Sequence, residues 1–323
     1  MEYAVCTLFE NQYHFGVAAL TNSLYQRGYR GPVFAGYRGE LPPWTSAARV
    51  NPSIKWPGSK TLDVAEGLQI HFLPLETDYH LTNYKPDFMM ILWNSIAKEA
   101  SAMYYFDPDI VINASWSVFQ DWVLCGVALC EDVNSPLAEN HPRRVAWRQY
   151  FGQKGISLTF RDHIYANGGY IGLSRKDQDF LAIWKSIQEE MSPAIGGLNR
   201  SSLNGAHLPT EADGPFAPFG KTDQDALNAS VEAWMGPVSF IGQEAMGIKS
   251  GEALMPHALG QPKPWNWEPI SQMLAGQAPR LVDKAYWRSS EGALIGAHSP
   301  GLIKRRLLAL KIASFIGRFY RRA

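Results

Sequence analysis

Two aspartates, one residue apart, carry the strongest chemical signal in this sequence. Asp107 and Asp109 flank Pro108, after the aromatic run 104–106 and before the β-branched run 110–112. Both runs predict short buried strands, which would present the carboxylates at a stiff break because proline fixes φ and lacks an amide donor. Hard oxygen ligands on a rigid corner suit a divalent cation such as Mg²⁺ or Mn²⁺ that also binds phosphates. The two aspartates could equally do no more than cap a turn.

A second chemical cluster begins much later in the chain, at His257. Gly260, Lys263 and the pair Pro264-Trp265 follow it at short intervals. They supply an imidazole that can bind a metal, a backbone position without a side chain, and a cation for phosphate. A lone histidine is more often a hydrogen-bonded core or surface residue than a metal ligand. The prediction of a site therefore rests on the glycine, lysine and Pro-Trp pair that follow His257 at fixed intervals.

Polar residues also interrupt two apolar segments between these clusters. Asn167 precedes a glycine pair at the head of an apolar strand, where a ligand or another backbone can approach closely. A β-bulge or tight turn would explain the same glycines. Further on, Thr222 can act as the N-cap of a helix whose first turn carries Asp223 and Asp225. Helix capping and the helix dipole would account fully for both acids.

The N-terminal elements indicate how such residues are positioned. Residues 3–8 predict a buried strand, residues 13–27 an amphipathic helix, and residues 32–35 a second strand. This order indicates an α/β wrap, in which ligands bind at the carboxyl ends of the strands, here residues 7–11. No Gly-x-Gly-x-x-Gly motif follows the first strand, so we expect no dinucleotide site.

Further strands, helices and one long loop are predicted between the second strand and the helix that carries Asp223. Lys85 stands just before a predicted helix, and a Gly- and Pro-rich segment over 192–220 predicts either a mobile flap beside a site or a solvated linker. The other predicted elements are strands over 70–75 and 123–129 and helices over 86–100 and 176–191.

Composition limits the class of protein. The 323 residues have a formal net charge of +0, which argues against nucleic acid as the main partner. The three cysteines lie in or beside apolar segments without a Cys-x-x-Cys pair, as expected for reduced thiols in a cytosolic protein. We expect no signal peptide, because the N-terminus has no basic region before an apolar run, and no membrane-spanning helix.

Taken together, these motifs resemble those of a known family. The chain is similar to the glycogenin and bacterial lipopolysaccharide galactosyltransferase family of retaining GT-A glycosyltransferases. The resemblance covers roughly residues 3–267 and implies an α/β GT-A nucleotide-diphospho-sugar transferase fold with a Rossmann-like mixed sheet. The motifs, in the family's order, are Asp107-x-Asp109, Asn167-x-Gly169, Asp223-Gln224-Asp225-x-Leu227-Asn228 and His257-x-x-Gly260-x-x-Lys263-Pro264-Trp265.

The resemblance implies a role for each matched residue. Asp107, Asp109 and His257 would coordinate Mn²⁺ (or Mg²⁺), which grips the diphosphate of a nucleotide sugar, most simply a UDP-sugar. Asp223 and Gln224 would face the reacting sugar and the acceptor hydroxyl. The remaining donor-binding residues would be Thr7, Phe9 and Asn11 under the base and ribose, Lys85 near the donor, Asn167 in the sugar pocket, and Gly260 and Lys263 at the diphosphate.

Three departures from the family pattern concern the sugar more than the reaction. Ala166 replaces the usual aromatic residue, Gly168 replaces a small side chain, and Glu10 is only close to the usual acidic position of the first strand. The chemistry itself is consistent with the motifs. A divalent metal stabilises the nucleoside diphosphate leaving group, a nearby lysine adds charge, and an oxocarbenium-like centre needs a polar face, which Asp223 and Gln224 could provide. A covalent nucleophile and same-face attack by the acceptor remain equally compatible.

The C-terminal residues 302–323 are basic and contain no acid. A helical wheel places Leu308, Ile312, Phe315, Ile316 and Phe319 on one stripe and Lys304, Lys311, Arg318 and Arg322 on the opposite one. Such a helix, with Arg305 and Arg306 also in it, is typical of a segment that lies on an anionic membrane surface. A terminal helix packed on the domain, with a solvated basic face, is the alternative.

These observations predict a catalytic domain over residues 1–300 and a membrane-associating helix over 301–323. The predicted enzyme is a hexosyltransferase, peripheral on the cytoplasmic face of a membrane, with a glycan or lipid-linked acceptor. One rival is a sugar nucleotidyltransferase, which would need a glycine-rich, arginine-containing loop after the first strand that residues 7–13 lack. The other is a nucleotide-sugar-binding module or inactive homologue.

Overall fold

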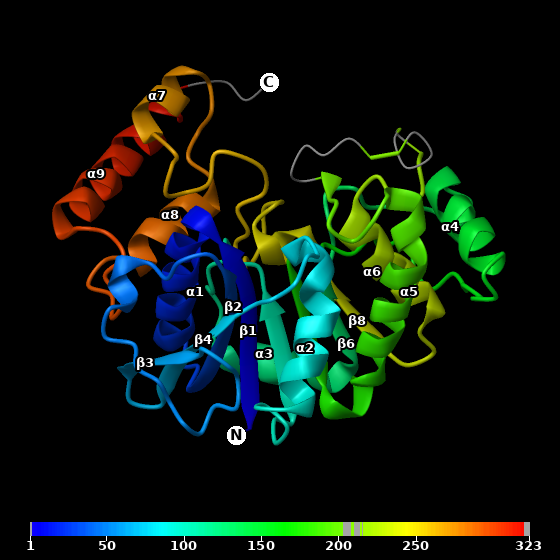
Figure 1. Cartoon of the computed structure of the whole chain (residues 1–323). Coiled ribbons are helices and arrows are strands. Elements are labelled where there is room, and N and C mark those ends of the chain that lie inside the picture. Colours follow the sequence, from blue (N-terminus) through cyan, green and yellow to red (C-terminus); the bar gives the residue numbers. More distant parts are fainter. Residues whose placement is uncertain (1, 203–207, 210–213, 215, 320–323) are drawn as a thin grey trace.

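The computed structural model describes residues 2–319 apart from 203–207, 210–213 and 215. Its strands form one mixed sheet in the order β3-β4-β2-β1-β5-β7-β6-β8 (Figure 1). The strands are β1 (Tyr3–Glu10), β2 (Gly31–Arg38), β3 (Lys60–Ala65), β4 (Leu68–Pro74), β5 (Ala102–Phe106), β6 (Val127–Cys130), β7 (Tyr170–Ser174) and β8 (Val238–Ile241). The helices are α1 (His14–Gln26), α2 (Lys85–Asn94), α3 (Trp116–Trp122), α4 (Pro142–Gly152), α5 (Asp179–Ile195), α6 (Thr222–Ala233), α7 (Pro269–Leu274), α8 (Leu281–Ser289) and α9 (Pro300–Ile316).

The directions of the strands bring the ends of several strands to one edge of the sheet. β1 pairs in parallel with β2 and β5, and β2 pairs in parallel with β4. β7 runs antiparallel to both β5 and β6, so β5 and β6 point the same way. The carboxyl ends of β1, β5 and β6 therefore meet at the edge where β7 begins, which is where α/β sheets bind ligands.

Helices cover both faces of the sheet, and the side chains of β1 alternate between them. Cys6 and Leu8 lie in the core formed with α2, α5 and α6, whereas Val5 and Phe9 lie in the core formed with α1 and α3. This alternation follows from the two-residue period of a strand, and burial on both faces explains why β1 is apolar throughout. The predicted α/β wrap is confirmed.

Several predicted boundaries shift in the structure. Residues 110–112 form no strand, and Ile110 makes only an isolated bridge to His257. The predicted strand over 123–129 begins only at Val127, because 123–125 form a 3-10 turn. The helix predicted over 86–100 starts at Lys85 and ends at Asn94, where the chain turns toward β5. The helix predicted over 176–191 is α5, which starts and ends later.

Two further sequence predictions are answered in part. Cys6 and Cys130 are unpaired and buried as predicted, whereas Cys125 is exposed. Much of the predicted flap over 192–220 lies outside the described residues, namely 203–207, 210–213 and 215. Within the described part of the chain, no helix is both long and apolar enough to cross a bilayer.

Candidate active site

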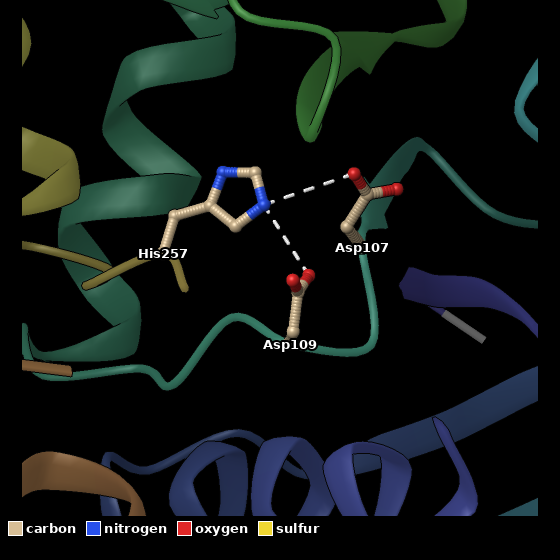
Figure 2. Close-up of side chains that lie close together, drawn as sticks. All are labelled: Asp107, Asp109 and His257. Atoms are coloured by element: carbon tan, nitrogen blue, oxygen red, sulfur yellow. Dashed lines mark ion pairs between the residues drawn. The ribbon is translucent and has the colours of Figure 1, made fainter. Parts of the chain in front are cut away.

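Three side chains from two distant segments converge at this edge of the sheet. Figure 2 shows Asp107 and Asp109 on one loop and His257 reaching toward them from another. The imidazole Nε2 lies 3.2 Å from Asp109 Oδ1 and 3.9 Å from Asp107 Oδ2. One ligand atom from each residue lies within 4.8 Å of the others. Two carboxylates and an imidazole at this separation form a donor set that can hold one divalent cation.

Backbone hydrogen bonds, more than regular secondary structure, hold the two segments together. Asp107 N donates to Gly169 O at 2.7 Å, which fixes the loop to the start of β7. The bridge between Ile110 and His257 is flanked by a hydrogen bond from Ala258 N to Asp109 O at 3.1 Å. The β-branched run after Asp109 thus pairs with the His257 segment, which places the imidazole beside the carboxylates.

Two glycines make room for this arrangement. A Cβ on Gly169 would lie 2.5 Å from His257 Cε1, so any side chain there would displace the imidazole. A Cβ on Gly16 of α1 would lie 2.1 Å from Pro108 O, because α1 packs directly under the Asp107–Asp109 loop. The sequence analysis singled out Gly169 and overlooked Gly16. A glycine in the first turn of an otherwise apolar helix was the available signal, since glycine disfavours helices.

Lys263 is the cation of the later cluster, and it contacts the metal-ligand set. Its Nζ donates to Asp109 Oδ2 at 2.6 Å and to Ala258 O at 2.7 Å, and the residue is buried. Burial favours the neutral amine, but Asp109, Tyr13 and Asp107 together more than compensate and raise the pKa of Lys263. Burial likewise opposes ionisation of Asp109, yet the charges of His257 and Lys263 hold the pKa of this carboxyl well below its usual range.

Lys85 is a second buried cation, at the first residue of α2. Its Nζ lies 3.3 Å from Asp107 Oδ1 and 3.2 Å from Asp223 Oδ2, and it donates to Gly168 O at 2.7 Å. Burial lowers the pKa of Lys85, but the two carboxylates more than compensate and raise it overall. A charged Lys85 therefore joins the Asp107 loop, the glycine pair and the start of α6.

At the start of α6, the structure corrects the predicted cap. Thr222 is the first helical residue, and the N-cap is Lys221. Asp225 supplies the capping contact, since its Oδ2 accepts from Lys221 N at 2.7 Å. Asp223 turns away from the cap toward Lys85, so capping explains only one of the two acids. Gln224 Oε1 accepts from Gly168 N at 3.2 Å.

Asn167 leads to a residue that the sequence analysis missed. Its Nδ2 donates to Asp132 Oδ2 at 2.6 Å, and its Oδ1 accepts from Gly169 N at 2.8 Å. Asp132 is buried and also accepts from Asn134 N at 2.9 Å. The signal was available, because Asp132 follows the buried strand β6 as Asp107 follows β5.

The candidate metal ligands and the polar residues around them line one cavity of about 460 Å³. This volume is within the usual range for small-molecule sites. The predicted site residues that line it are Phe9, Asp107, Asp109, Asn167, Asp223, Gln224, His257, Gly260 and Lys263. Residues that the sequence analysis did not assign also line it, among them Tyr13, Asp132, Asn134, Ser202 and Leu259.

Three predicted donor-binding residues do not line the cavity. Thr7 is fully buried in β1, and its hydroxyl has no hydrogen-bond partner among the described residues. Asn11 is exposed at the end of β1, with a φ of 51°. Lys85 lies beneath the cavity and reaches it only through Asp107, Asp223 and the Gly168 carbonyl.

No protein-family model and no curated protein matches this chain. Among solved structures, the WbbM bifunctional glycosyltransferase superposes with a TM-score of 0.52 at 14% sequence identity. The fold resembles that of a glycosyltransferase. The match covers 95% of this chain and 52% of the WbbM chain, so this protein spans about half the length of that structure. The predicted GT-A-like α/β fold is thereby confirmed.

Proposed function

We propose that this protein is a metal-dependent glycosyltransferase that moves a hexose from a nucleotide sugar to a glycan or lipid-linked acceptor. The observation that carries the proposal is the convergence of Asp107, Asp109 and His257 in a cavity that also presents Lys263 and the pair Asp223-Gln224. Cations and metal ligands suit a diphosphate, and neutral and acidic polar groups suit a sugar. The resemblance of the motifs to the glycogenin and lipopolysaccharide galactosyltransferase family supports the same reaction, with a UDP-sugar as donor.

The residues present fit a divalent cation. The His257 Nε2 faces the two carboxylates, Lys85 is paired with Asp107, and the charges of His257 and Lys263 favour the ionised form of Asp109. An imidazole beside oxygen ligands suits Mn²⁺ better than Mg²⁺, which prefers oxygen alone. When bound, such a cation acts as a Lewis acid that stabilises the departing nucleoside diphosphate.

The other residues of the cavity divide into two groups. Lys263 and the backbone at Gly260, which line the cavity, would bind the diphosphate, where a buried ammonium contributes more than an exposed one. Gln224 and Asn167 carry amide groups that can donate to sugar hydroxyls, and Asp223 is held in one orientation by Lys85. We propose retention at the anomeric carbon on the family resemblance, and we assign no nucleophile.

The test is release of UDP from a panel of UDP-sugars with Mn²⁺ and membrane-derived glycan acceptors. We expect one donor to raise the melting temperature of the protein by mass action and to yield UDP only when an acceptor is present. Donor binding without any UDP release would favour the alternative of a nucleotide-sugar-binding module. Release of pyrophosphate from a nucleoside triphosphate and a sugar phosphate would identify a nucleotidyltransferase instead.

A further inference from the structure

The C-terminal helix α9 is a packed part of the domain. Its buried face consists of Ile303, Leu310 and Ala313, and the helix packs against α7 and α8. Arg306 adds a polar anchor, since its guanidinium donates to both carboxylate oxygens of Glu268 and lies over the ring of Trp287. The alternative prediction of a terminal helix packed on the domain is thus correct for this face.

The outward face of the same helix and of the turn after it is apolar. Leu308, Ile312, Phe315 and Phe319 are 60%, 44%, 59% and 74% exposed. Their spacing of four, three and four residues places them on one stripe of a helix. Large apolar side chains gathered in one exposed stripe mark a contact surface, whereas scattered ones are ordinary.

Basic side chains border this stripe on both sides. Lys304 and Lys311 precede Leu308 and Phe315 by four residues, so they share the outward face and do not lie opposite, as the helical wheel had suggested. All four of these residues are exposed, as is Arg318. The side opposite the stripe is the one that Ile303 and Leu310 bury. Arg322 of the predicted basic stripe lies outside the described residues.

A groove of about 560 Å³ between α7 and α9 continues the apolar surface. Ile270, Leu274 and Ala309 form its walls, and Leu274 is 67% exposed. Arg305 lies at this groove, on the other side of the stripe from Lys304 and Lys311. The apolar centre is therefore bordered by cations on both flanks, and residues 299–319 contain no acid.

We propose that the outward face of α9, with the α7–α9 groove, binds a membrane surface that carries anionic headgroups. The apolar stripe enters the interface, and the flanking lysines and arginines reach up to the phosphates. Glu268 also lines the groove, but its carboxylate is paired with Arg306. The cations on both flanks of the stripe favour a lipid surface over a second copy of this chain, which would bring the same cations into contact. Figure 1 shows α7 and α9 at the end of the molecule toward which β1 runs from the N-terminus, which is the end that carries the site.

The experiment is flotation of the full chain with phosphatidylcholine vesicles, with and without phosphatidylglycerol. We expect binding only with the anionic lipid. The double substitution Lys304→Gln and Lys311→Gln should lower the partition coefficient about 30-fold, since each basic residue near an anionic surface strengthens binding about fivefold. Phe315→Ser should lower it roughly 10- to 100-fold. Exposed residues are chosen because deleting α9 would expose Ile303 and Trp287 and could unfold the protein.

Matched controls are Lys249→Gln and Met235→Ser, a basic and an apolar exposed residue elsewhere. Both should bind vesicles like the wild type, and all variants should retain the wild-type melting temperature. A wild-type chain that stays unbound with anionic vesicles would overturn the proposal. So would equal loss of binding in the controls, or a dimer in solution that Phe315→Ser dissociates, which would identify a second copy as the occupant. Vesicle flotation does not depend on UDP binding, so the membrane proposal can fail while the proposed function stands, and the reverse.

Discussion

Lys263 and Asp109 stand 154 positions apart in the chain, and their side chains share a hydrogen bond of 2.6 Å. The other oxygen of the same carboxylate lies 3.2 Å from His257 Nε2. Asp109 therefore links the candidate metal-ligand set to Lys263, the cation proposed to bind the diphosphate. It also fixes the segment from His257 to Lys263 against the end of β5, so that the proposed recognition of metal and of phosphate depends on one buried group.

Replacing Lys263 tests the phosphate role. Lys263→Met should weaken UDP affinity in the presence of Mn²⁺ by roughly 10- to 100-fold, because a hydrogen bond to a charged group contributes about 1.5–3 kcal/mol. Isothermal titration with UDP measures this directly. Lys284→Met, on the partly exposed surface of α8, is the control. Equal UDP affinity in Lys263→Met and wild type would remove Lys263 from the donor site.

Replacing Gly16 tests whether α1 supports the proposed metal-binding loop. Gly16→Ala places a Cβ 2.1 Å from Pro108 O, and overpacking of this kind costs about 1–3 kcal/mol. We expect a lower free energy of unfolding together with weaker Mn²⁺ binding. Gly152→Ala in α4 meets open space and should stabilise the protein by up to about 1 kcal/mol. Unchanged stability and Mn²⁺ affinity in Gly16→Ala would show that α1 does not constrain the loop.

Asp225 should give the protein an unusual pH dependence of stability. Burial raises the pKa of this carboxyl to about 7 in the folded protein, although Arg143 opposes the shift. Between the ordinary aspartate pKa of about 3.9 and this value, the folded state binds more protons than the unfolded state. The contribution of Asp225 to stability is therefore present at acidic pH and declines as the pH rises toward 7.

Urea unfolding at pH 5 and pH 8 measures the effect. Asp225→Asn should remove this decline, so that the variant loses less stability than the wild type between the two pH values. Lys221 N and the Tyr165 hydroxyl donate to different oxygens of Asp225. The amide oxygen of asparagine can keep the bond from Lys221 N, and its NH₂ group can donate to the Tyr165 hydroxyl oxygen. An identical pH dependence in variant and wild type would contradict the assignment of this titration to Asp225.

Replacing Asp132 tests whether the proposed sugar positioning can be separated from donor binding. Asp132 accepts a hydrogen bond from Asn167, and both residues line the cavity that contains the candidate metal ligands. Asp132→Asn replaces an acceptor with a donor facing the Asn167 amide. We expect transfer to fall by about tenfold or more, with UDP and Mn²⁺ affinities unchanged, since one charge-assisted hydrogen bond is lost. A parallel loss of UDP affinity would instead indicate a general disturbance of the cavity.

The sequence was a good guide wherever side-chain types and periodicity determine structure. β1, α1 and β2 follow from apolar patterning, and Asp107, Asp109 and Asn167 stand out by their places at strand ends. It was a poor guide to distances between remote segments. His257 was joined to the aspartates through family resemblance alone, because the Ile110–His257 bridge has no local signature.

The remaining errors have local physical causes. Thr222 was expected to cap α6, but Asp225 reaches back to the Lys221 amide and displaces it from that role. Lys304 and Lys311 were placed opposite the apolar stripe of α9, although residues four apart share a helix face. Gly16 was overlooked although a glycine in the first turn of a helix is a signal; what the sequence does not give is the backbone that approaches it, Pro108.

The central claim is that Asp107, Asp109 and His257 bind a cation that in turn binds a nucleotide diphosphate. The direct measurement is UDP affinity with Mn²⁺ and with EDTA, for wild type, Asp107→Asn, Asp109→Asn and the exposed control Asp121→Asn, each checked for folding by circular dichroism. We predict that EDTA or either site substitution abolishes tight UDP binding and that Asp121→Asn leaves it intact. Equal UDP affinity with Mn²⁺ and EDTA in the wild type would contradict the account.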